Sequence, residues 1–405
     1  MFRRGIILVS GGESELATVV GLSTEGYSIA SGLVQSGVET IIVDENLQMG
    51  MRLTPEIVAT YSSVGSLLEG ETLVSLEPMD SAIHRAKYVF FTPKIRRRDQ
   101  EAKAEMATRF RDTAKSISKG ATVIFCLPVG FKESRGNISM IEKMSGLNPD
   151  EDFHYVYAPL KPRTKTPHVL GVEGKTDKKM LDIFRQAGIK APQATGYDAA
   201  ELICFREVLA GCLPIALDLE VCKKVEDRAE RSKMKKALQY KDVYIDQVME
   251  SLFDLRFALG TLDTGDPALY LASGVFKSVE GYAKYLVDEI RQVMREKDLK
   301  ASRTKVTLAW AVDRFEMRGE RLAALEGIAD RLRDYIGDVN FLNGSEGNQS
   351  SSGGYSRMMT DVNKIDLVVI CSEQDHEYAV KSFNLKDKQT DTIVLKADLF
   401  IDRYG

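Results

Sequence analysis

The stretch from Thr18 to Glu45 reads "TVVGLSTEGYSIASGLVQSGVETIIVDE". A β-branched run leads into a turn with glycines, an amphipathic segment follows, and a second β-branched run ends at an acidic residue. This order of strand, turn, helix and strand is typical of a parallel α/β sheet. The N-terminal part of the chain is therefore expected to form a sheet whose faces are covered by helices.

The same alternation continues through the N-terminal half of the chain. A first strand is expected at "GIILVS", which we favour over a signal peptide because glycines and a glutamate follow at once. A helix is expected from Met106 to Lys119, with Gly120 closing it in the left-handed conformation that glycine tolerates. These elements indicate one domain with a parallel sheet.

The period of the hydrophobic pattern changes near Tyr197 and changes back near Thr304. The segment "DAAELICFREVLAGCLPIALDLEVC" is apolar on nearly every side, as a helix buried inside a domain would be. Long apolar helices exceed what one small domain can bury, so this region predicts a homodimer interface. The predicted architecture is an N-terminal Rossmann domain, a central helical dimerisation domain and a C-terminal second Rossmann-like α/β domain. Their expected bounds are 1–195, 196–300 and 301–405.

Composition excludes several classes of protein. The formal net charge of −4 gives no general attraction to nucleic acid or to anionic membranes. No apolar run approaches the ~20 residues that cross a bilayer. The five cysteines are scattered without a CxxC pair or a nearby histidine, which indicates reduced thiols and opposes a structural zinc site. We therefore expect a cytoplasmic protein without a metal site, whose partners are small molecules rather than nucleic acid or membrane.

The turn in the opening stretch resembles a dinucleotide-binding turn with one substitution. Gly21 and Gly26 can fill its first and third glycine positions, which form the tight turn and let helix and strand pack closely. Ser23 holds the middle position, where its hydroxyl could donate to a phosphate. Thr24 and Glu25 complete the expected cofactor-binding segment, although the Glu25 carboxylate opposes a phosphate unless it points to solvent.

An acidic residue follows at the expected distance. Asp44 ends the next strand, near the spacing of the acid that accepts the ribose hydroxyls of the cofactor. A carboxylate there disfavours a 2′-phosphate, so NAD is expected rather than NADP. Two alternatives stay open. The strand–helix unit could have an empty or altered site, or the phosphate turn could be "VSGGES" with Gly11 and Gly12.

Four later segments follow one another as in a known family. "AIHRAKYVFFTP" resembles the helix, strand and Thr-Pro turn of the nucleotide-sugar dehydrogenases, the UDP-glucose/GDP-mannose dehydrogenase family. "GATVIFCLPVGFKE" resembles the family's strand that ends in Ser-Thr-Val-Pro. "YVYAPLKPRTKTPHVLGVEG" is similar to its Pro-Glu-Arg loop, and "AAELICFREV" to its Ala-Glu-x-x-Lys helix. The resemblance covers nearly the whole chain and places it in the 6-phosphogluconate-dehydrogenase-like superfamily.

The resemblance implies a ligand class and a cofactor. It adds Thr92 and Pro93 to the residues expected to bind the cofactor, since the family's Thr-Pro turn lies there. It implies NAD as cofactor and a small-molecule nucleotide or nucleotide-sugar as ligand. The family oxidises a nucleotide-sugar alcohol twice, with a cysteine nucleophile and a lysine–asparagine pair.

The residues that do this chemistry differ in this chain. The position of the family's lysine is Cys204, and that of its asparagine is Val208. The strand-end threonine is Cys126, and the glutamate of the sugar-binding loop is Leu160. The loop "GTLDTGDPALYLASG", nearest to the place of the nucleophile, has no cysteine. Because a thiohemiacetal route needs a thiolate and a nearby lysine, we expect this sugar oxidation to be lost.

Five residues remain candidates for a site. Cys126 and Cys204 are the catalytic candidates, although each also fits a buried structural thiol. Lys161 and Arg163 in "PLKPRTK" could bind a phosphate or carboxylate. Arg318 lies near the place of the family's arginine that contacts the nucleotide sugar. Each of these three also fits a residue on the surface.

A second resemblance leads to a different function. "FFTPK", "FCLPVG" and "LDTGDPALYLASGVF" are similar to the methenyltetrahydromethanopterin hydrogenase group. Its active members bind an iron–guanylylpyridinol cofactor through one cysteine, and Cys126 lies near that place. Three functions therefore stay open: an oxidoreductase with a rearranged catalytic set, a non-catalytic nucleotide or nucleotide-sugar binding protein, and a protein that handles a guanylylpyridinol-type cofactor.

Overall fold

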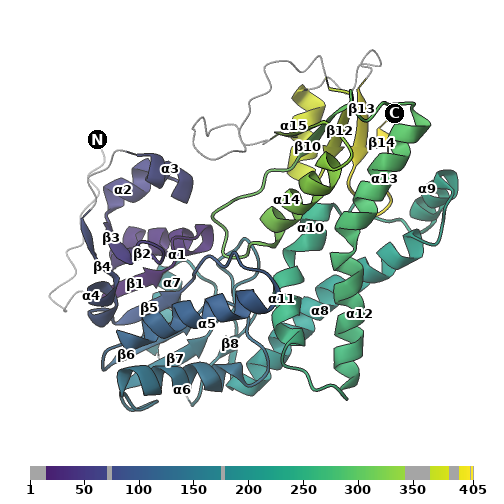
Figure 1. Ribbon diagram of the computed structural model, residues 1–405. Coiled ribbons are helices and arrows are strands. Elements are labelled where there is room, and N and C mark those ends of the chain that lie inside the picture. The colour runs from purple at the N-terminus through teal and green to yellow at the C-terminus, as the bar shows by residue number, and fades with distance from the viewer. Residues whose placement is uncertain are drawn as a thin grey trace, which may run out of the picture.

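The computed structural model describes residues 15–70, 75–174, 178–342, 365–382, 392–401 and 403–404. Figure 1 shows a large sheet with its helices, a group of long helices beside it, and a second, smaller sheet. The predicted fold class, two α/β domains joined by a helical region, is confirmed. The expected strand "GIILVS" and the alternative turn at Gly11 and Gly12 lie outside the described residues.

The N-terminal sheet has nine strands in the order β4-β3-β2-β1-β5-β6-β7-β8-β9. Its five parallel central strands are β2 (Glu39–Asp44), β1 (Leu16–Val20), β5 (Tyr88–Phe91), β6 (Ala121–Phe125) and β7 (Phe153–Tyr157). The strands outside them are β3 (Met49–Leu53) and the edge strand β4 (Leu76–Pro78) on one side, and β8 (Leu170–Gly171) and the edge strand β9 (Ala194–Thr195) on the other. The central strands are nearly continuous apolar runs because helices cover both faces of the sheet.

The helices of this domain connect its strands. They are α1 (Thr24–Gln35), α2 (Pro55–Thr60), α3 (Val64–Glu69), α4 (Met79–His84), α5 (Asp99–Lys115), α6 (Glu133–Ser145) and α7 (Lys178–Gln186). The chain leaves β1 toward β2 and later returns to β5 on the other side of β1. The carboxyl ends of β1 and β5 therefore form the switch point at which such sheets bind ligands.

One helix differs from its predicted bounds. The helix expected from Met106 to Lys119 is α5, which begins earlier and ends earlier, at Lys115. Ser116 closes it, because its N–H donates to the carbonyl groups of Ala114 and Thr113. Gly120 does adopt a positive φ of 85°, but it lies directly before β6 and does not cap the helix.

Six helices follow the N-terminal sheet. They are α8 (Tyr197–Cys222), α9 (Arg228–Ala237), α10 (Ile245–Glu250), α11 (Leu252–Leu259), α12 (Pro267–Glu280) and α13 (Tyr282–Glu296). The expectation that α8 is buried on every side is wrong for the single chain. One stripe, with Cys204, Val208 and Leu219, packs into the core, whereas Leu202 and Leu217 are 55% and 62% exposed. Helix α8 therefore has one buried apolar face and one uncovered apolar face.

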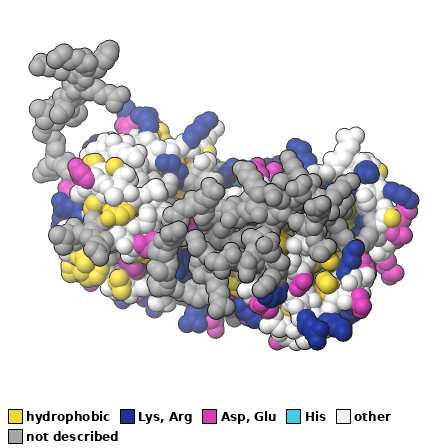
Figure 2. Space-filling view, turned by 90° about the horizontal axis from the view of Figure 1, so that it is seen from above, with side chains coloured by type: hydrophobic (Ala, Val, Ile, Leu, Met, Phe, Trp, Pro, Cys, Tyr) yellow, Lys and Arg dark blue, Asp and Glu magenta, His cyan; other side chains and the backbone are white. Residues whose placement is uncertain are grey.

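The C-terminal sheet has the order β11-β10-β12-β13-β14. Its strands are β11 (Asp338–Leu342), β10 (Lys305–Ala309), β12 (Leu367–Ile370), β13 (Ile393–Lys396) and β14 (Arg403–Tyr404), and its helices are α14 (Glu320–Arg333) and α15 (Glu373–Ser382). No helix in the described segments is both long enough and apolar enough for a membrane span. Figure 2 shows basic and acidic side chains interspersed over the described part of one face.

Candidate functional site

The two glycines of the turn are required by close packing within the N-terminal domain. Gly21 has a φ of 123°, and a Cβ there would lie 2.2 Å from the carbonyl oxygen of Thr92 and 2.6 Å from the Cα of Pro93. A Cβ on Gly26 would lie 2.5 Å from the Oγ1 of Thr92. The end of β1, the end of β5 and the first turn of α1 can approach one another only because both residues lack a side chain.

Ser23, at the middle position of the turn, is used inside the fold. It is the N-cap of α1, and its fully buried hydroxyl accepts from the N–H of Gly26 at 3.1 Å and donates to the carbonyl of Thr92 at 2.7 Å. Serine is a preferred N-cap residue, and this preference is the sequence signal for the role. In this arrangement the hydroxyl that was expected to donate to a phosphate is already bonded to the protein.

The N–H groups of Leu22 and Thr24, both in the turn, are bonded to the chain itself. The N–H of Leu22 donates to the carboxylate of Glu45 at 3.1 Å, and the N–H of Thr24 donates to the carbonyl of Phe315 at 2.8 Å. The Thr24 hydroxyl donates to the carboxylate of Asp313. A helix N-terminus attracts such acceptors, since its first N–H groups lack partners within the helix.

From the sequence, a phosphate is expected beside Glu25 only if its carboxylate points to solvent. In the structure this carboxylate does not point to solvent. Its side chain is only 3% exposed and accepts from the N–H of Met317 at 2.9 Å. Burial raises the pKa of the Glu25 carboxyl, and the nearby Arg318 guanidinium partly offsets this. Glu25 therefore joins α1 to the C-terminal domain.

The two acidic residues at the carboxyl end of β2, Asp44 and Glu45, make different contacts. Asp44 accepts from the N–H groups of Asn46 at 2.9 Å and Leu47 at 3.3 Å, so it shapes the turn that follows the strand. Glu45 is 5% exposed and bridges the ends of β1 and β5, because it also accepts from the N–H of Lys94 at 3.0 Å. The spacing in the sequence pointed to Asp44 rather than to Glu45, although the adjacent pair of acids was the available signal.

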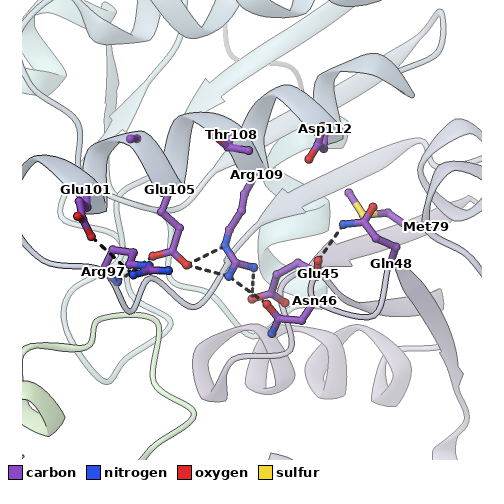
Figure 3. Close-up of a pocket in the computed structure, with 11 residues that line it drawn as sticks. Glu45, Asn46, Gln48, Met79, Arg97, Glu101, Glu105, Thr108, Arg109 and Asp112 are labelled. Carbon is purple, nitrogen blue, oxygen red and sulfur yellow. Dashed lines mark hydrogen bonds and ion pairs between the residues drawn. The ribbon is translucent and has the colours of Figure 1, made fainter.

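A cavity of about 720 Å³ opens beside Glu45, between the turn after β2 and one face of α5. It is lined by Glu45, Asn46, Gln48, Met79, Arg97, Glu101, Ala104, Glu105, Thr108, Arg109 and Asp112. Its residues from α5 recur every three or four positions, as one helix face requires. In Figure 3, Arg109 reaches from α5 to Glu45 at 3.2 Å and to Asn46 at 3.1 Å. A volume of this size is typical of small-molecule sites.

The two candidate cysteines are buried away from this cavity. Cys126 follows β6 with 1% of its surface exposed, and Cys204 lies on the core face of α8 with 2% exposed. Burial raises the pKa of both thiols, that of Cys204 to about 12. Burial therefore opposes the thiolate form that a nucleophile or a metal ligand needs. Across the described residues, no group of three or more His, Cys, Asp and Glu side chains could hold a metal ion.

The three cationic candidates do not form one anion site. Lys161 is about half exposed and lies 3.8 Å from Glu207. Arg163 donates to Glu250 at 2.8 Å and to Asp246 at 3.0 Å, which places it at the contact with α10. Each of these two side chains therefore faces a carboxylate of the helical region.

Arg318 is buried, so the alternative that it lies on the surface is wrong. It is 4% exposed, and its guanidinium donates to both carboxylate oxygens of Asp254 at 2.6 and 3.0 Å. It also donates to the carbonyl of Leu160 at 2.6 Å. Arg318 therefore joins the C-terminal domain to α11 and to the N-terminal domain.

The space around Arg318 is too small for a nucleotide sugar. The cavity there measures about 10 Å³, close to the least that holds one water molecule. Its lining includes Arg163, Arg318 and Arg321, with carboxyl groups between them. Burial raises the pKa of Glu316 to about 7 and that of Glu320 to about 8. In this arrangement, the expected substrate arginines hold the domains together.

Comparison with known proteins identifies the fold. No protein-family model and no curated protein matches the chain. A UDP-D-ManNAc dehydrogenase from Pyrococcus horikoshii is 14% identical, with 96% of each chain covered and a TM-score of 0.63. A UDP-glucose dehydrogenase from Pyrobaculum islandicum is 14% identical, with 97% of this chain and 96% of that chain covered and a TM-score of 0.60.

A third similar structure is more distant. A UDP-N-acetyl-mannosamine dehydrogenase from S. aureus is 16% identical, with 89% of each chain covered and a TM-score of 0.54. None of these three structures supports the resemblance to the hydrogenase group. At such identities the likeness concerns the fold alone. Over nearly its whole length, the chain has the fold of the nucleotide-sugar dehydrogenases.

Proposed function

We propose that this chain binds a nucleotide, with NAD as the first candidate, in the cavity between the turn after β2 and α5. The observation that supports this most directly is the position of the cavity. It lies beside Glu45, which bridges the carboxyl ends of β1 and β5 at the switch point of the sheet. The similar structures are named as dehydrogenases of UDP-sugars, which supports a nucleotide as the ligand class.

Charge favours NAD over NADP in this proposal. The cavity is lined by four carboxylates and by the two guanidinium groups of Arg97 and Arg109. Both guanidinium groups lie close to carboxylates, with Arg109 bonded to Glu45 and Glu105. A 2′-phosphate would add negative charge to this lining. Asp44 and Glu45 are the residues that we expect to accept the ribose hydroxyls, with Thr92 and Pro93 beside the turn.

We do not extend the proposal to the family's double oxidation. Bound NAD would supply a hydride acceptor, but Cys204 stands at the lysine position and is buried with a raised pKa. Cys126 is buried as well. The proposed activity is therefore binding of a nucleotide or nucleotide-sugar, without the thiohemiacetal route.

Filling the cavity should weaken nucleotide binding. Ala104 lines the cavity on α5, so Ala104→Trp would place an indole in it while keeping a residue that helices accept. We expect calorimetric titration to show NAD binding to the unmodified chain and a loss of at least about tenfold in affinity in this variant. Arg111→Trp, at an exposed position of the same helix outside the cavity lining, is the matched control.

Different outcomes of this titration test the place of the nucleotide, the residue that contacts the ribose, and the preference for NAD. Equal binding to Ala104→Trp and to the unmodified chain would place the nucleotide elsewhere. A loss in Asp44→Ala but not in Glu45→Gln would assign the ribose contact to Asp44, as the sequence suggested. Preference for NADP over NAD would contradict the charge argument.

We also propose that the chain forms a homodimer through the uncovered face of α8. Leu202, Leu213, Leu217 and Val221 recur on that face at helical spacing and are 39–62% exposed. Exposed apolar side chains gathered on one helix face are typical of protein interfaces, and exposed Arg206 lies on this face between Leu202 and Leu213. The helix has no charged residue between Leu213 and Leu217, which fits the depletion of charge at interface centres.

An aspartate on this face should dissociate the dimer. Leu217→Asp is expected to weaken association by about 2 kcal/mol or more, and a two-fold axis applies the change twice. Light scattering after size-exclusion chromatography would measure the mass. Leu47→Asp, at a leucine of the N-terminal domain that is 71% exposed, should leave the mass unchanged. A monomer in the unmodified chain, or a dimer in Leu217→Asp, would refute this interface.

A further inference from the structure

A short segment of the C-terminal domain lies across the N-terminus of α1. Residues 313–318, "DRFEMR", connect β10 to α14, and we call this segment the strap. Its Phe315 carbonyl accepts from the N–H of Thr24 at 2.8 Å, and the N–H of Met317 donates to the Glu25 carboxylate at 2.9 Å. The Met317 carbonyl accepts from the N–H of Ile95 at 2.9 Å. The strap therefore contacts the segments that follow both β1 and β5.

Arg96 also holds the strap. Its guanidinium donates to the carbonyl groups of Arg314 and Glu316, both at 2.7 Å. Gly319 follows the strap, and a Cβ there would lie 2.9 Å from the carbonyl oxygen of Ile95. The glycine therefore permits the close approach of the two chain segments.

The contacts at Thr24 occupy groups that could otherwise bind an anion. The first N–H groups of an α-helix, together with its dipole, favour phosphate at the helix N-terminus. Here the Thr24 N–H is bonded to a carbonyl of the strap, and the Thr24 hydroxyl is bonded to the Asp313 carboxylate. A carbonyl oxygen and a carboxylate oxygen thus accept the bonds that phosphate oxygens would accept.

We propose that the strap is an autoinhibitory contact that competes with the diphosphate of a nucleotide for the N-terminus of α1. This inference rests on the proposed nucleotide function. Apart from the bonds of Arg318 to Asp254 and Leu160, the strap contacts named above lie at Thr24, Glu25, Ile95 and Arg96, and none of these four residues lines the 720 Å³ cavity. A nucleoside therefore enters the cavity with the strap in place, whereas a diphosphate ligand binds fully only after the Phe315 carbonyl and the Asp313 carboxylate have moved away from Thr24.

Loosening the strap tests this inference. Arg96→Gln removes the guanidinium that holds two strap carbonyls, and Asp313→Asn removes the charge that competes with a phosphate. Each variant is expected to raise the affinity for ADP by about tenfold, because the competent state becomes more populated. The affinity for adenosine should stay the same. Calorimetric titration with both probes measures the two affinities.

Arg98→Gln is the matched control. Arg98 also reaches the C-terminal domain, where it donates to the carbonyl of Ala323 at 3.2 Å, but it does not contact the strap. It should bind ADP like the unmodified chain. If Arg96→Gln does not fold, Asp313→Asn decides the question, because Asp313 is not buried and asparagine keeps its shape.

Three results are informative. Equal ADP affinity in the unmodified chain and both strap variants overturns the strap inference, while the proposed nucleotide function stands. Higher ADP affinity in the strap variants with constant adenosine affinity supports both. Binding of neither probe to any variant overturns the nucleotide function, and the strap inference with it. Hydrogen exchange gives an independent readout, since saturating ADP should speed exchange at the Met317 amide and adenosine should not.

Discussion

Arg318→Met is expected to lower the free energy of unfolding by about 3–5 kcal/mol, as removal of one partner of a buried ion pair does. The Arg318 guanidinium donates to both oxygens of Asp254, whose side chain is fully buried. Methionine fills a similar volume but leaves this carboxylate without its partner. The Leu160 carbonyl also loses a donor. Chemical denaturation monitored by circular dichroism would measure the loss.

An exposed pair of the same chemistry is the control. Arg135 pairs with Asp198 at 3.2 Å, but both side chains are more than half exposed. Arg135→Met should therefore cost no more than about 1 kcal/mol. Adding Asp254→Leu to Arg318→Met should recover part of the lost stability, because the buried charge is then removed. Equal stability of Arg318→Met and Arg135→Met would contradict the importance assigned to the buried pair.

Gly21→Ala is expected to destabilise the chain by about 2–5 kcal/mol, the combined cost of a left-handed side-chain residue and of overpacking. The new Cβ would lie 2.2 Å from the carbonyl oxygen of Thr92 and 2.6 Å from the Cα of Pro93. Both are main-chain atoms, so relief requires the ends of β1 and β5 to separate. Thermal unfolding would show a lower melting temperature.

Two other glycines distinguish the cost of a positive φ from the cost of overpacking. Gly37 has a φ of 82° with no heavy atom near a Cβ, so Gly37→Ala should cost only about 1–2 kcal/mol. Gly136, in α6, has free space and no positive φ, so Gly136→Ala should stabilise the chain by about 0.5–1 kcal/mol. If Gly21→Ala were no less stable than Gly37→Ala, the contact with Thr92 would not limit the turn.

Local pattern was enough to predict the elements of the nucleotide turn. The run from Thr18 to Glu45 forms β1, α1 and β2 as expected, because strand and helix periods are properties of neighbouring residues. The need for glycine at Gly21 and Gly26 was also predictable from the turn. The N-cap role of Ser23 followed from the known preference of helix starts for serine, but it was read as a possible phosphate donor.

Contacts between distant segments were not predictable in this way. Glu25 was expected to oppose a phosphate, yet its carboxylate accepts from Met317, far along the chain. Arg318 was assigned to a substrate or to the surface, yet it is buried against Asp254. A charged side chain shows no periodicity that reveals its partner, because that partner is chosen by how the domains pack.

The sequence by itself determined the fold class, the two glycines of the turn and, through the family resemblance, the departure from the family's catalytic residues. Each of these features depends on residue type and on spacing between residues that are close in the chain. Only the tertiary structure decided that Cys126 and Cys204 are buried, that Glu45 bridges two strand ends, and that the strap covers α1. Burial and hydrogen bonding at these places depend on residues that lie far apart in the chain, and no local pattern encodes which of them meet.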